Sequence, residues 1–295
     1  MKVGIVVISF NHFLFTKFCI ESIFKHTPRD LYKLCIVDNG SIDETKSWAN
    51  NLLLNKDIDN FINNDYNMGA CKASNQGMEI FMNDSDITHV LVMANDHIVT
   101  PNWLLPMINS DYACVNPFVF YSTSTMRKLD LNIGKIIDKY KYRRLKYLQS
   151  DSFENMCYVL NKTYENLDIF SEKFTQRYLE NAVIPSTFIV WPGLILYKKE
   201  VIETIGFKDE EYLKFDLAAY ADIDYYLRAY LAGFNSAVVM TSFVHHWGSI
   251  TTRKNGLKQE NEKGYTNKEG GAYKYFIKKW NCNPHNLTSL LTRKC

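Results

Sequence analysis

The amino-acid sequence predicts an α/β fold, with a Rossmann-like, mostly parallel sheet, flanking helices, a largely helical insertion and a C-terminal tail. Over the first 120 residues, apolar runs alternate with helical patterns about 10–15 residues long, as in consecutive β-α-β units. The first run, Val3–Phe10, is continuously apolar, which is typical of a strand covered on both faces. No small-residue cleavage site follows this run, so we interpret it as a buried strand rather than a signal sequence.

The next elements carry local start and stop signals. Phe13–Lys25 has apolar residues at helical spacing and ends before a proline. Ser41, with a glutamate three residues later, forms a capping-box pattern that predicts Ser41 as the N-cap of a helix over Ile42–Leu54. A helix over Pro101–Ile108 starts with proline, which is favoured in the first turn. The remaining elements of this half are a helix over Ala70–Met82 and strands over Leu31–Asp38, Asp59–Asn63, Ile87–Ala94 and Tyr112–Phe118.

The alternation stops near residue 120 and resumes near residue 183. We therefore expect four parts, which are 1–120, an insertion over 121–182, a second α/β part over 183–252, and a tail over 253–295. The insertion is polar and aromatic, and we expect it to be helical. Glycines follow two helical patterns of the second part, as is common at helix C-termini. The elements expected after the insertion are strands over Thr187–Trp191 and Leu194–Tyr197, helices over Lys199–Ile205 and Ala219–Ala232, extended segments over Asn235–Met240 and Phe243–His246, and a helix near Tyr273–Trp280.

Composition excludes several classes of protein. The 34 basic and 32 acidic residues give a net charge of +2, so the chain as a whole is not a polycation of the nucleic-acid-binding type. Seven widely spaced cysteines without a C-x-x-C pair indicate free thiols rather than a zinc site or a disulfide framework, and predict a cytoplasmic protein. No apolar stretch reaches the roughly 18 residues that a transmembrane helix needs. The aromatic content of 14% fits either a core or a surface that stacks sugars or bases.

Polar residues follow four of the expected strands. In an open α/β sheet the ligand lies at the carboxyl ends of the strands, so these residues are candidates for a binding site, although Asp, Asn and Gly also favour ordinary turns. Neither G-x-G-x-x-G nor a P-loop occurs, which argues against a dinucleotide-binding dehydrogenase and a P-loop NTPase. A divalent cation on Asp96, beside His97, is another way to bind a diphosphate. The four segments are Ser9-Phe10-Asn11-His12, Asp38-Asn39-Gly40-Ser41, Asp65-Tyr66-Asn67-Met68-Gly69 and Asn95-Asp96-His97.

Two pairs of residues in the second half are further candidates. Asp222 and Asp224 lie near the start of a helix, where acidic residues also complement the helix dipole. Their spacing puts them on different faces, so one can point into a cleft as a general base while the other caps the helix or pairs with Arg228. His245 and His246 are adjacent in an extended segment and therefore point to opposite faces, so at most one of them readily joins a given site.

Eight short motifs occur in a defined order along the chain. The two most specific are Val37–Asp43, which reads V-D-N-G-S-I-D, and Asn67–Gly77, which reads N-M-G-A-C-K-A-S-N-Q-G. The other six are Val6–Asn11, Cys19–Ile23, Asp96 with Pro101–Leu104, Gly193 with Ile205–Phe207, Asp222–Phe234, and His246–Ser249. Together they resemble the motifs of GT-A glycosyltransferases, specifically the large inverting family 2 with its rhamnosyl- and glucosyltransferase-like members. The resemblance covers most of the chain outside the insertion and the tail.

The resemblance implies a donor, a metal and a role for each site residue. The donor would be a nucleotide-diphosphate sugar, with UDP favoured, and its base would be read by Asp38. Asp96 would hold the diphosphate through Mn or Mg, with His246 completing the shell. Asp222 would take the proton of an acceptor hydroxyl, which attacks the anomeric carbon with inversion. The nucleotide site would be lined by Ser9, Phe10, Asn11, Asp38, Asn67, Gly69 and Asn95, and the acceptor side would include Trp191, Gly193, Asp224 and His245.

Two positions depart from the motifs of the family. Ala94 stands where the acidic pair has its first member, which leaves one carboxylate for the metal unless His97 contributes. Ala221 stands where a glutamate precedes the catalytic aspartate, so the acceptor is expected to be unusual. These departures motivate an alternative function, a non-catalytic protein that binds nucleotide sugars or carbohydrates, although the proposed base and metal ligands are all retained.

The acceptor stays open between a glycan, a lipid-linked sugar, a protein and a modified base in DNA. Arg127–Lys146 carries eight Lys and Arg residues against two Asp, interleaved with tyrosines. This basic strip, residues 127–147, would contact nucleic acid or an anionic membrane surface, or would form an ordinary solvated helix face. A steep fall of nucleic-acid affinity with salt distinguishes these alternatives.

Overall fold

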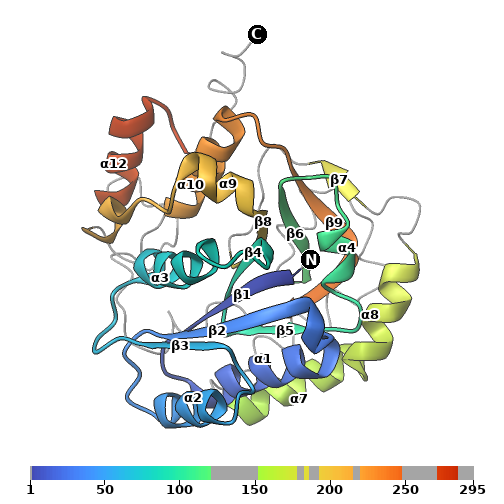
Figure 1. The fold of residues 1–295 in the computed structure, drawn as a ribbon. Helices are drawn as coiled ribbons and strands as arrows, with labels where there is room; N and C mark the ends of the chain where they lie inside the picture. The colour runs from blue at the N-terminus through green and yellow to red at the C-terminus, as the bar shows by residue number, and fades with distance from the viewer. Residues whose placement is uncertain are drawn as a thin grey trace.

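Nine strands of the described residues form one sheet, with helices on both of its faces (Figure 1). The computed structural model describes residues 2–120, 152–177, 183–185, 193–214, 220–247 and 271–284. The strand order is β3-β2-β1-β4-β8-β6-β9-β5, and β7 also pairs with β9. The strands are β1 (Lys2–Ser9), β2 (Tyr32–Asp38), β3 (Asn60–Asn63), β4 (Ile87–Ala94), β5 (His97–Val99), β6 (Cys114–Phe120), β7 (Val183–Pro185), β8 (Leu194–Lys198) and β9 (Ser236–His246). The α-helices are α1 (Phe13–His26), α2 (Thr45–Leu54), α3 (Ala70–Met82), α4 (Leu105–Ile108), α7 (Phe153–Tyr164), α8 (Leu167–Gln176), α9 (Lys199–Ile205), α10 (Ala221–Leu231) and α12 (Gly271–Trp280).

The first four strands along the sheet are parallel, as the alternation of strands and helices predicts. β1 pairs with β2 on one side and β4 on the other, and β2 pairs with β3. Ile5, Val6 and Val7 are fully buried, which agrees with a strand covered on both faces. The antiparallel strand β8 connects β4 to β6, and β6 pairs in parallel with β9. The carboxyl ends of β1, β2 and β4 therefore meet at one edge of the sheet.

The helices cover the sheet in two sets (Figure 1). On one face α1 packs on β5, α2 packs on β2 and β3, and α4 packs on β6 and β9. On the other face α3 packs on β1, β2 and β4, α9 packs on β4 and β8, and α10 packs beside α9. α3 lies directly on β1: a Cβ atom on Gly4 would come within 2.3 Å of Phe81, and one on Gly77 within 2.3 Å of Val6. Any larger residue at Gly4 or Gly77 would force the helix away from the sheet.

Two helices begin later than the sequence predicts. α2 starts three residues later, because Ser41 does not cap it. The Ser41 hydroxyl donates to the Asp38 carboxylate and accepts the N–H of Asn11 at 2.7 Å. α4 starts four residues later than expected, and Pro101 lies in the turn before it. In both cases a polar or proline residue that is favoured at a helix start belongs instead to the loop that precedes the helix.

The second half of the sheet contains a strand that the sequence does not predict. β5 has three residues and pairs with the end of β9, with His97 opposite His246 and Val99 opposite Val244. β9 is a single strand of 11 residues where two extended segments are expected. This pairing brings the residues that follow β4 next to the carboxyl end of β9.

The described part of the insertion is helical, as predicted. α7 and α8 start at side-chain N-caps, Ser152 and Asn166, each of which accepts a backbone N–H of the first turn. Their apolar faces pack on β9 and Trp247. The basic strip at 127–147 and the expected strand Thr187–Trp191, with its candidate acceptor residue, lie outside the described residues.

The tail contributes α12, which packs on α10 and on the short 3₁₀ helix η4 (Glu210–Lys214). Tyr273 and Phe276 fill the apolar contact. A buried carboxylate completes it, because Asp224 of α10 accepts the indole N–H of Trp280 at 2.7 Å and lies 2.8 Å from Nζ of Lys279. The tail helix therefore fixes the region around the start of α10.

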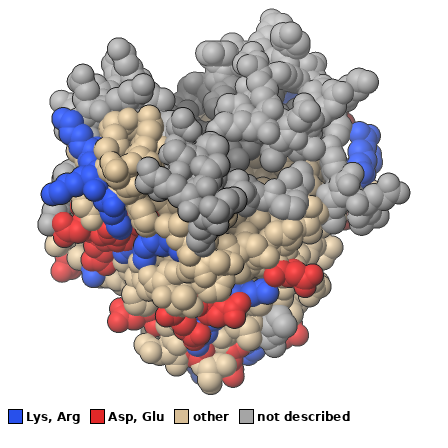
Figure 2. All heavy atoms as spheres, turned by 90° about the horizontal axis from the view of Figure 1, so that it is seen from above, with Lys and Arg blue, Asp and Glu red and all other residues tan. Residues whose placement is uncertain are grey.

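Charged side chains of both signs lie next to one another on the face seen from above (Figure 2). Examples of close pairs in the described residues are Lys33 with Asp84 at 2.6 Å and Arg29 with Asp59 at 2.8 Å. This mixture agrees with the small net charge of +2. Among the described helices, none is both long and apolar enough to cross a lipid bilayer.

Candidate active site

The carboxyl ends of β1 and β2 form a loop pair that encloses Asp38. Asn11, in the left-handed region at φ 55°, donates its N–H to the Ser41 hydroxyl and accepts the N–H of Ile42 at 2.9 Å. The Ser41 hydroxyl and N–H both donate to Asp38. Burial raises the pKa of the Asp38 carboxyl, and the two hydrogen bonds from Ser41 oppose that rise. Asp38 is thus a buried hydrogen-bond acceptor at the carboxyl ends of the strands, which is the edge of an α/β sheet where ligands bind.

Asn67 and Gly69 shape the turn that leads into α3. The Asn67 side-chain oxygen accepts the Asn39 amide at 2.8 Å and the Gly69 N–H at 2.9 Å. Gly69 has a φ of +83°, and a Cβ atom there would come 2.5 Å from Leu213 of η4. The backbone conformation favours glycine at this position, and a side chain there would also displace the end of the Leu213 side chain. The turn after β3 therefore contacts η4, which belongs to the second half of the chain.

Ser9 and Asn95 bond inward beneath these loops. Ser9 Oγ lies 2.8 Å from Oγ1 of Thr16, and Nδ2 of Asn95 donates to the same Thr16 oxygen at 2.8 Å. Nδ2 of Asn95 also lies 3.4 Å from the carbonyl oxygen of Asn11. Both side chains are buried, whereas Phe10 is partly exposed. This network ties the exits of β1 and β4 to the start of α1.

Asp96 and His246 form a buried polar pair where β4 and β9 end. Nε2 of His246 lies 3.1 Å from Oδ1 of Asp96. Two ligand atoms that each bind one ion at about 2.2 Å, at a right angle, are also about 3.1 Å apart. A carboxylate oxygen and an imidazole nitrogen together suit Mn²⁺ and similar ions. The pair therefore fits a divalent cation.

His97 belongs to the same cluster, since its ligand atom lies within 4.8 Å of those of Asp96 and His246. Its ring stacks on that of His246 with centroids 4.2 Å apart and an interplanar angle of 3°. A Cβ atom on Gly193 would come 2.9 Å from His97, so glycine is the residue that leaves room for the stack.

The protonation state of His97 follows from its surroundings. Burial, together with His246, lowers the pKa of His97 to about 3, so its ring is neutral at physiological pH. Its Nδ1 donates to the carbonyl oxygen of Ala94 at 3.0 Å. The other nitrogen, Nε2, then carries the lone pair, and it is buried without a hydrogen-bond partner in the described part of the chain.

His245 points to the opposite face of β9, as adjacent strand residues do. Its Nδ1 lies 3.0 Å from the hydroxyl of Tyr164 in α7, and its ring contacts Trp247 edge to face. The two adjacent histidines therefore belong to different environments: His246 joins Asp96, and His245 joins the helical insertion.

Asp222 and Asp224 also separate, as their spacing predicts. Asp224 is fully buried and lies 3.1 Å from Nε of Arg228, in addition to its contacts with α12. The Asp222 side chain is 33% exposed, and its Oδ1 accepts the ammonium of Lys208 at 2.7 Å. Of the two carboxylates, Asp222 is the one that a substrate can reach.

The sequence does not single out Lys208, because its contact with Asp222 depends on the packing of a loop against α10. It also does not predict the stacking of His97 on His246, which requires the unexpected strand β5. The lysine lies in a run of charged residues, Lys208–Glu211, that reads as a solvated loop. Lys208 is the only cation of that run, and no local signal in the sequence shows that it is buried.

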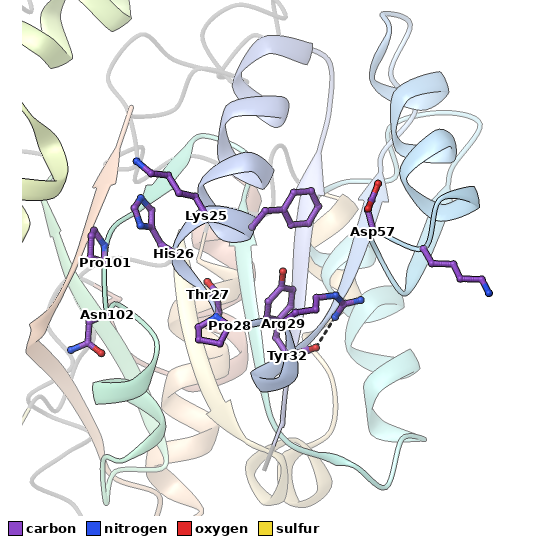
Figure 3. Close-up of a pocket in the computed structure, with 11 residues that line it drawn as sticks. Lys25, His26, Thr27, Pro28, Arg29, Tyr32, Asp57, Pro101 and Asn102 are labelled. Atoms are coloured by element: carbon purple, nitrogen blue, oxygen red, sulfur yellow. Dashed lines mark hydrogen bonds between the residues drawn. The ribbon is translucent and has the colours of Figure 1, made fainter.

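A hollow of about 830 Å³ lies at the opposite edge of the sheet, beside the start of β2 (Figure 3). It is lined by the end of α1, by Tyr32, and by Pro101 and Asn102. Two of its cations already have carboxylate partners, since Lys25 lies 2.7 Å from Asp168 and Arg29 contacts Asp59. None of the predicted site residues within the described ranges lines this hollow.

The comparisons with known proteins agree with the fold. The family model described as Glycosyl transferase family 2 matches residues 4–206, so the chain belongs to that family. Its mixed, mostly parallel sheet with flanking helices is the GT-A fold. The chain matches none of the curated proteins with which its sequence was compared.

Three solved structures are similar to the chain. GalNAc-T7 with UDP, GalNAc and Mn²⁺ has a TM-score of 0.55 at 12% identity, with 83% of this chain and 43% of that chain covered. Residues 1–349 of TarS from S. aureus have a TM-score of 0.52 at 13% identity, with 83% and 60% covered. The mannosyltransferase PcManGT from Pyrobaculum calidifontis, in complex with GDP-Man and Mn²⁺, has a TM-score of 0.53 at 13% identity, with 90% and 58% covered. The chain thus spans between 43% and 60% of the length of these proteins.

Proposed function

We propose that the chain transfers a sugar from a nucleoside-diphosphate sugar, with UDP-sugars favoured, to an acceptor hydroxyl with inversion at the anomeric carbon. The observation that carries the proposal is the buried Asp96–His246 pair at the ligand-binding edge of a family 2 sheet. The structures of two similar proteins contain Mn²⁺ together with UDP or GDP-Man, which supports the same donor class. Residues 1–120 form the donor half in this proposal, and residues 183–252 form the acceptor half.

Asp38 is the residue that reads the nucleotide base. It is a buried acceptor at the end of β2, and a buried carboxylate strongly prefers a ligand N–H as a hydrogen-bond partner. Phe10 and Asn11 shape the pocket around it, and Asn67 and Gly69 line the nucleotide on the α3 side. Ser9 and Asn95 contribute by fixing the loops, since their polar groups bond to Thr16.

Asp96 and His246 hold a divalent cation, Mn²⁺ or Mg²⁺, against the diphosphate. When bound, the cation supplies positive charge that stabilises the departing nucleoside diphosphate. His97 keeps the His246 ring in its orientation by stacking, and its neutral state avoids repulsion of the cation. The single carboxylate, with alanine at position 94, makes the imidazole of His246 an essential second ligand.

Asp222 acts as the general base on the acceptor side. Its carboxylate accepts the proton of the acceptor hydroxyl, whose oxygen attacks the anomeric carbon as the bond to the diphosphate breaks. Trp191 and Gly193 border the acceptor in this proposal. Asp224 and His245 support the acceptor side without touching the acceptor, because the Asp224 carboxylate contacts Arg228 and the His245 ring contacts Tyr164. The acceptor is a glycan, a lipid-linked sugar, a protein or a modified DNA base, and the strip at 127–147 contacts nucleic acid or a membrane surface if the acceptor is carried by one.

Release of nucleoside diphosphate from a panel of UDP- and GDP-sugars with Mn²⁺ tests the proposal. We expect turnover of at least one donor by the unmodified chain, and a loss of about a hundredfold or more in the Asp222→Asn variant. Unchanged turnover in Asp222→Asn would remove the base from the mechanism. Tight donor binding without hydrolysis or transfer would favour the alternative, a non-catalytic sugar-binding protein, which the alanines at positions 94 and 221 motivate.

A further inference from the structure

Lys208 is a buried lysine that contacts the proposed base. Its side chain is 6% exposed, and its Nζ donates to Oδ1 of Asp222 at 2.7 Å. Burial opposes the charged form of a lysine, yet the charge of the Asp222 carboxylate and its hydrogen bond keep the pKa of Lys208 above its ordinary value. The ammonium is therefore a permanent partner of Asp222 at physiological pH.

The backbone of Lys208 is fixed from α3. The side chain of Asn75 accepts the Lys208 N–H at 3.0 Å and donates to the Lys208 carbonyl oxygen at 2.9 Å. Both bonds are buried, and the same Asn75 amide donates to Glu210 at 2.9 Å. α3 begins directly after Gly69, in the turn that we assign to the donor. A chain of contacts thus runs from the donor side, through Asn75 and Lys208, to Asp222.

The neighbouring carboxylates have partners of their own. Asp209 accepts from Lys279 at 2.6 Å and Glu210 lies 3.2 Å from Lys72. Asp224 pairs with Arg228 and Lys279, as described above. Lys208 and Asp222 consequently neutralise each other.

The other titratable groups around the pair are uncharged. Burial raises the pKa of the Cys71 thiol to about 12, and it raises the pKa values of Tyr197 and Tyr226 well above their ordinary range. These groups face the pair from α3, β8 and α10. None of them supplies a charge that would replace Lys208 beside Asp222.

We propose that Lys208 is a positioning residue for Asp222: its ammonium fixes Oδ1 and thereby leaves Oδ2 for the acceptor hydroxyl. The proposal rests on the proposed function of Asp222 as the base. Within the described residues, Lys208 is the one hydrogen-bond donor to this carboxylate. Without the ammonium, the short Asp222 side chain rotates freely at the protein surface, and the base spends less time in the reactive orientation.

Lys208→Met tests this role, because methionine keeps the length and apolar stem of lysine and removes the ammonium. We expect kcat for the donor found in the panel to fall about tenfold or more, while KM for the donor and the affinity for UDP stay within about twofold. Lys208→Arg restores a charged donor and is expected to recover most of kcat. Lys72→Met is the matched control, since Lys72 contacts the same loop through Glu210 and is expected to leave kcat unchanged.

The outcomes separate the two proposals. If Asp222→Asn abolishes turnover and Lys208→Met has wild-type kcat, the positioning role is overturned and the base assignment stands. If Asp222→Asn has wild-type turnover, the base assignment fails, and the positioning role fails with it. A loss of kcat in Lys208→Met with recovery in Lys208→Arg supports both.

A second measurement tests the pair without activity. Each single variant, Lys208→Met and Asp222→Asn, leaves one member without its partner and is expected to lower the melting temperature. The double variant removes both charges, so its loss is expected to be smaller than the sum of the two single losses. Strictly additive losses would show that the two side chains do not interact in solution, which overturns the proposal.

Discussion

Nε2 of His246 lies 3.1 Å from Oδ1 of Asp96, although 150 positions separate the two residues in the sequence. The short strand β5 produces this contact, because it follows Asp96 directly and pairs with the last residues of β9. Asp96 also accepts the N–H of Trp247 through its backbone oxygen at 2.9 Å. The two residues end next to each other at the ligand-binding edge of the sheet, where we propose that they bind one cation.

Replacement of His246 is expected to weaken metal binding, whereas replacement of its neighbour is not. His246→Gln removes a nitrogen ligand, and we expect Mn²⁺ affinity to fall at least about tenfold, as measured by titration calorimetry. His245→Gln is the matched control, because His245 points to Tyr164 on the other face of β9. Equal affinities in the two variants would contradict the assignment of His246.

Gly193 is expected to tolerate no side chain. In Gly193→Ala, the new Cβ atom lies 2.9 Å from the His97 ring and 3.8 Å from the His246 ring, so the stack has to shift. We expect a severalfold loss of Mn²⁺ affinity by calorimetry. Gly206→Ala is the control: its Cβ atom meets open space, and its backbone conformation, φ 73° and ψ −166°, costs an alanine about 1–3 kcal/mol of stability without a change in metal affinity. Unchanged Mn²⁺ binding in Gly193→Ala would show that the stack is not needed.

Replacement of the two aspartates of α10 is expected to have different effects on stability and turnover. Asp224→Asn leaves Arg228 without its carboxylate partner, while Lys279 keeps Asp209, so we expect the free energy of unfolding to fall by about 3 kcal/mol. Asp222→Asn also lowers the stability, because it leaves the buried ammonium of Lys208 without its carboxylate, but it is expected to remove turnover from protein that is still folded. Chemical denaturation of both variants, with the donor assay at native conditions, distinguishes them. Wild-type turnover by folded Asp222→Asn, or loss of turnover by folded Asp224→Asn alone, would contradict the assignment.

The stability of the chain relative to Asp38→Asn is expected to depend on pH. Burial raises the pKa of Asp38 above its value in the unfolded chain, so the folded state binds the proton more tightly. The protonated Asp38 therefore adds to the free energy of unfolding at pH values below its pKa in the unfolded chain, which is near 4. This stabilisation is lost as the pH rises through the higher pKa that Asp38 has in the folded chain. The difference in melting temperature between the wild type and Asp38→Asn should therefore increase in favour of the wild type from pH 7 to pH 4. A difference independent of pH would mean that Asp38 is not buried in this way.

The fold is largely predictable from the sequence, because most elements carry their own signal. The helix over Ala70–Met82 has the predicted bounds, and the apolar run near the N-terminus forms the central strand of the parallel part. β5 is not predictable in this way. It has three residues and exists only through its pairing with β9, which no local pattern encodes. Ser41 misleads for a related reason, since its hydroxyl bonds to Asp38 across the loop and not to the helix that follows.

The candidate site is predictable where residue type and motif order suffice. Polar strand ends and the family resemblance select Asp96 and His246, and the structure brings these two together. Spacing alone separates Asp222 from Asp224, because i and i+2 lie on different helix faces. Lys208 has no such signal: it is one charged residue among several in a loop, and only tertiary packing buries it against Asp222.

Calorimetric titration of UDP, with Mn²⁺ and with the metal chelated, tests the central claim most directly. If Asp96 and His246 hold the cation on which the donor diphosphate binds, Mn²⁺ should raise the UDP affinity of the wild type by about tenfold or more and should have no effect on Asp96→Asn. A UDP affinity that is the same with and without Mn²⁺ in the wild type, or an Asp96→Asn variant that responds to Mn²⁺ as the wild type does, would contradict the account.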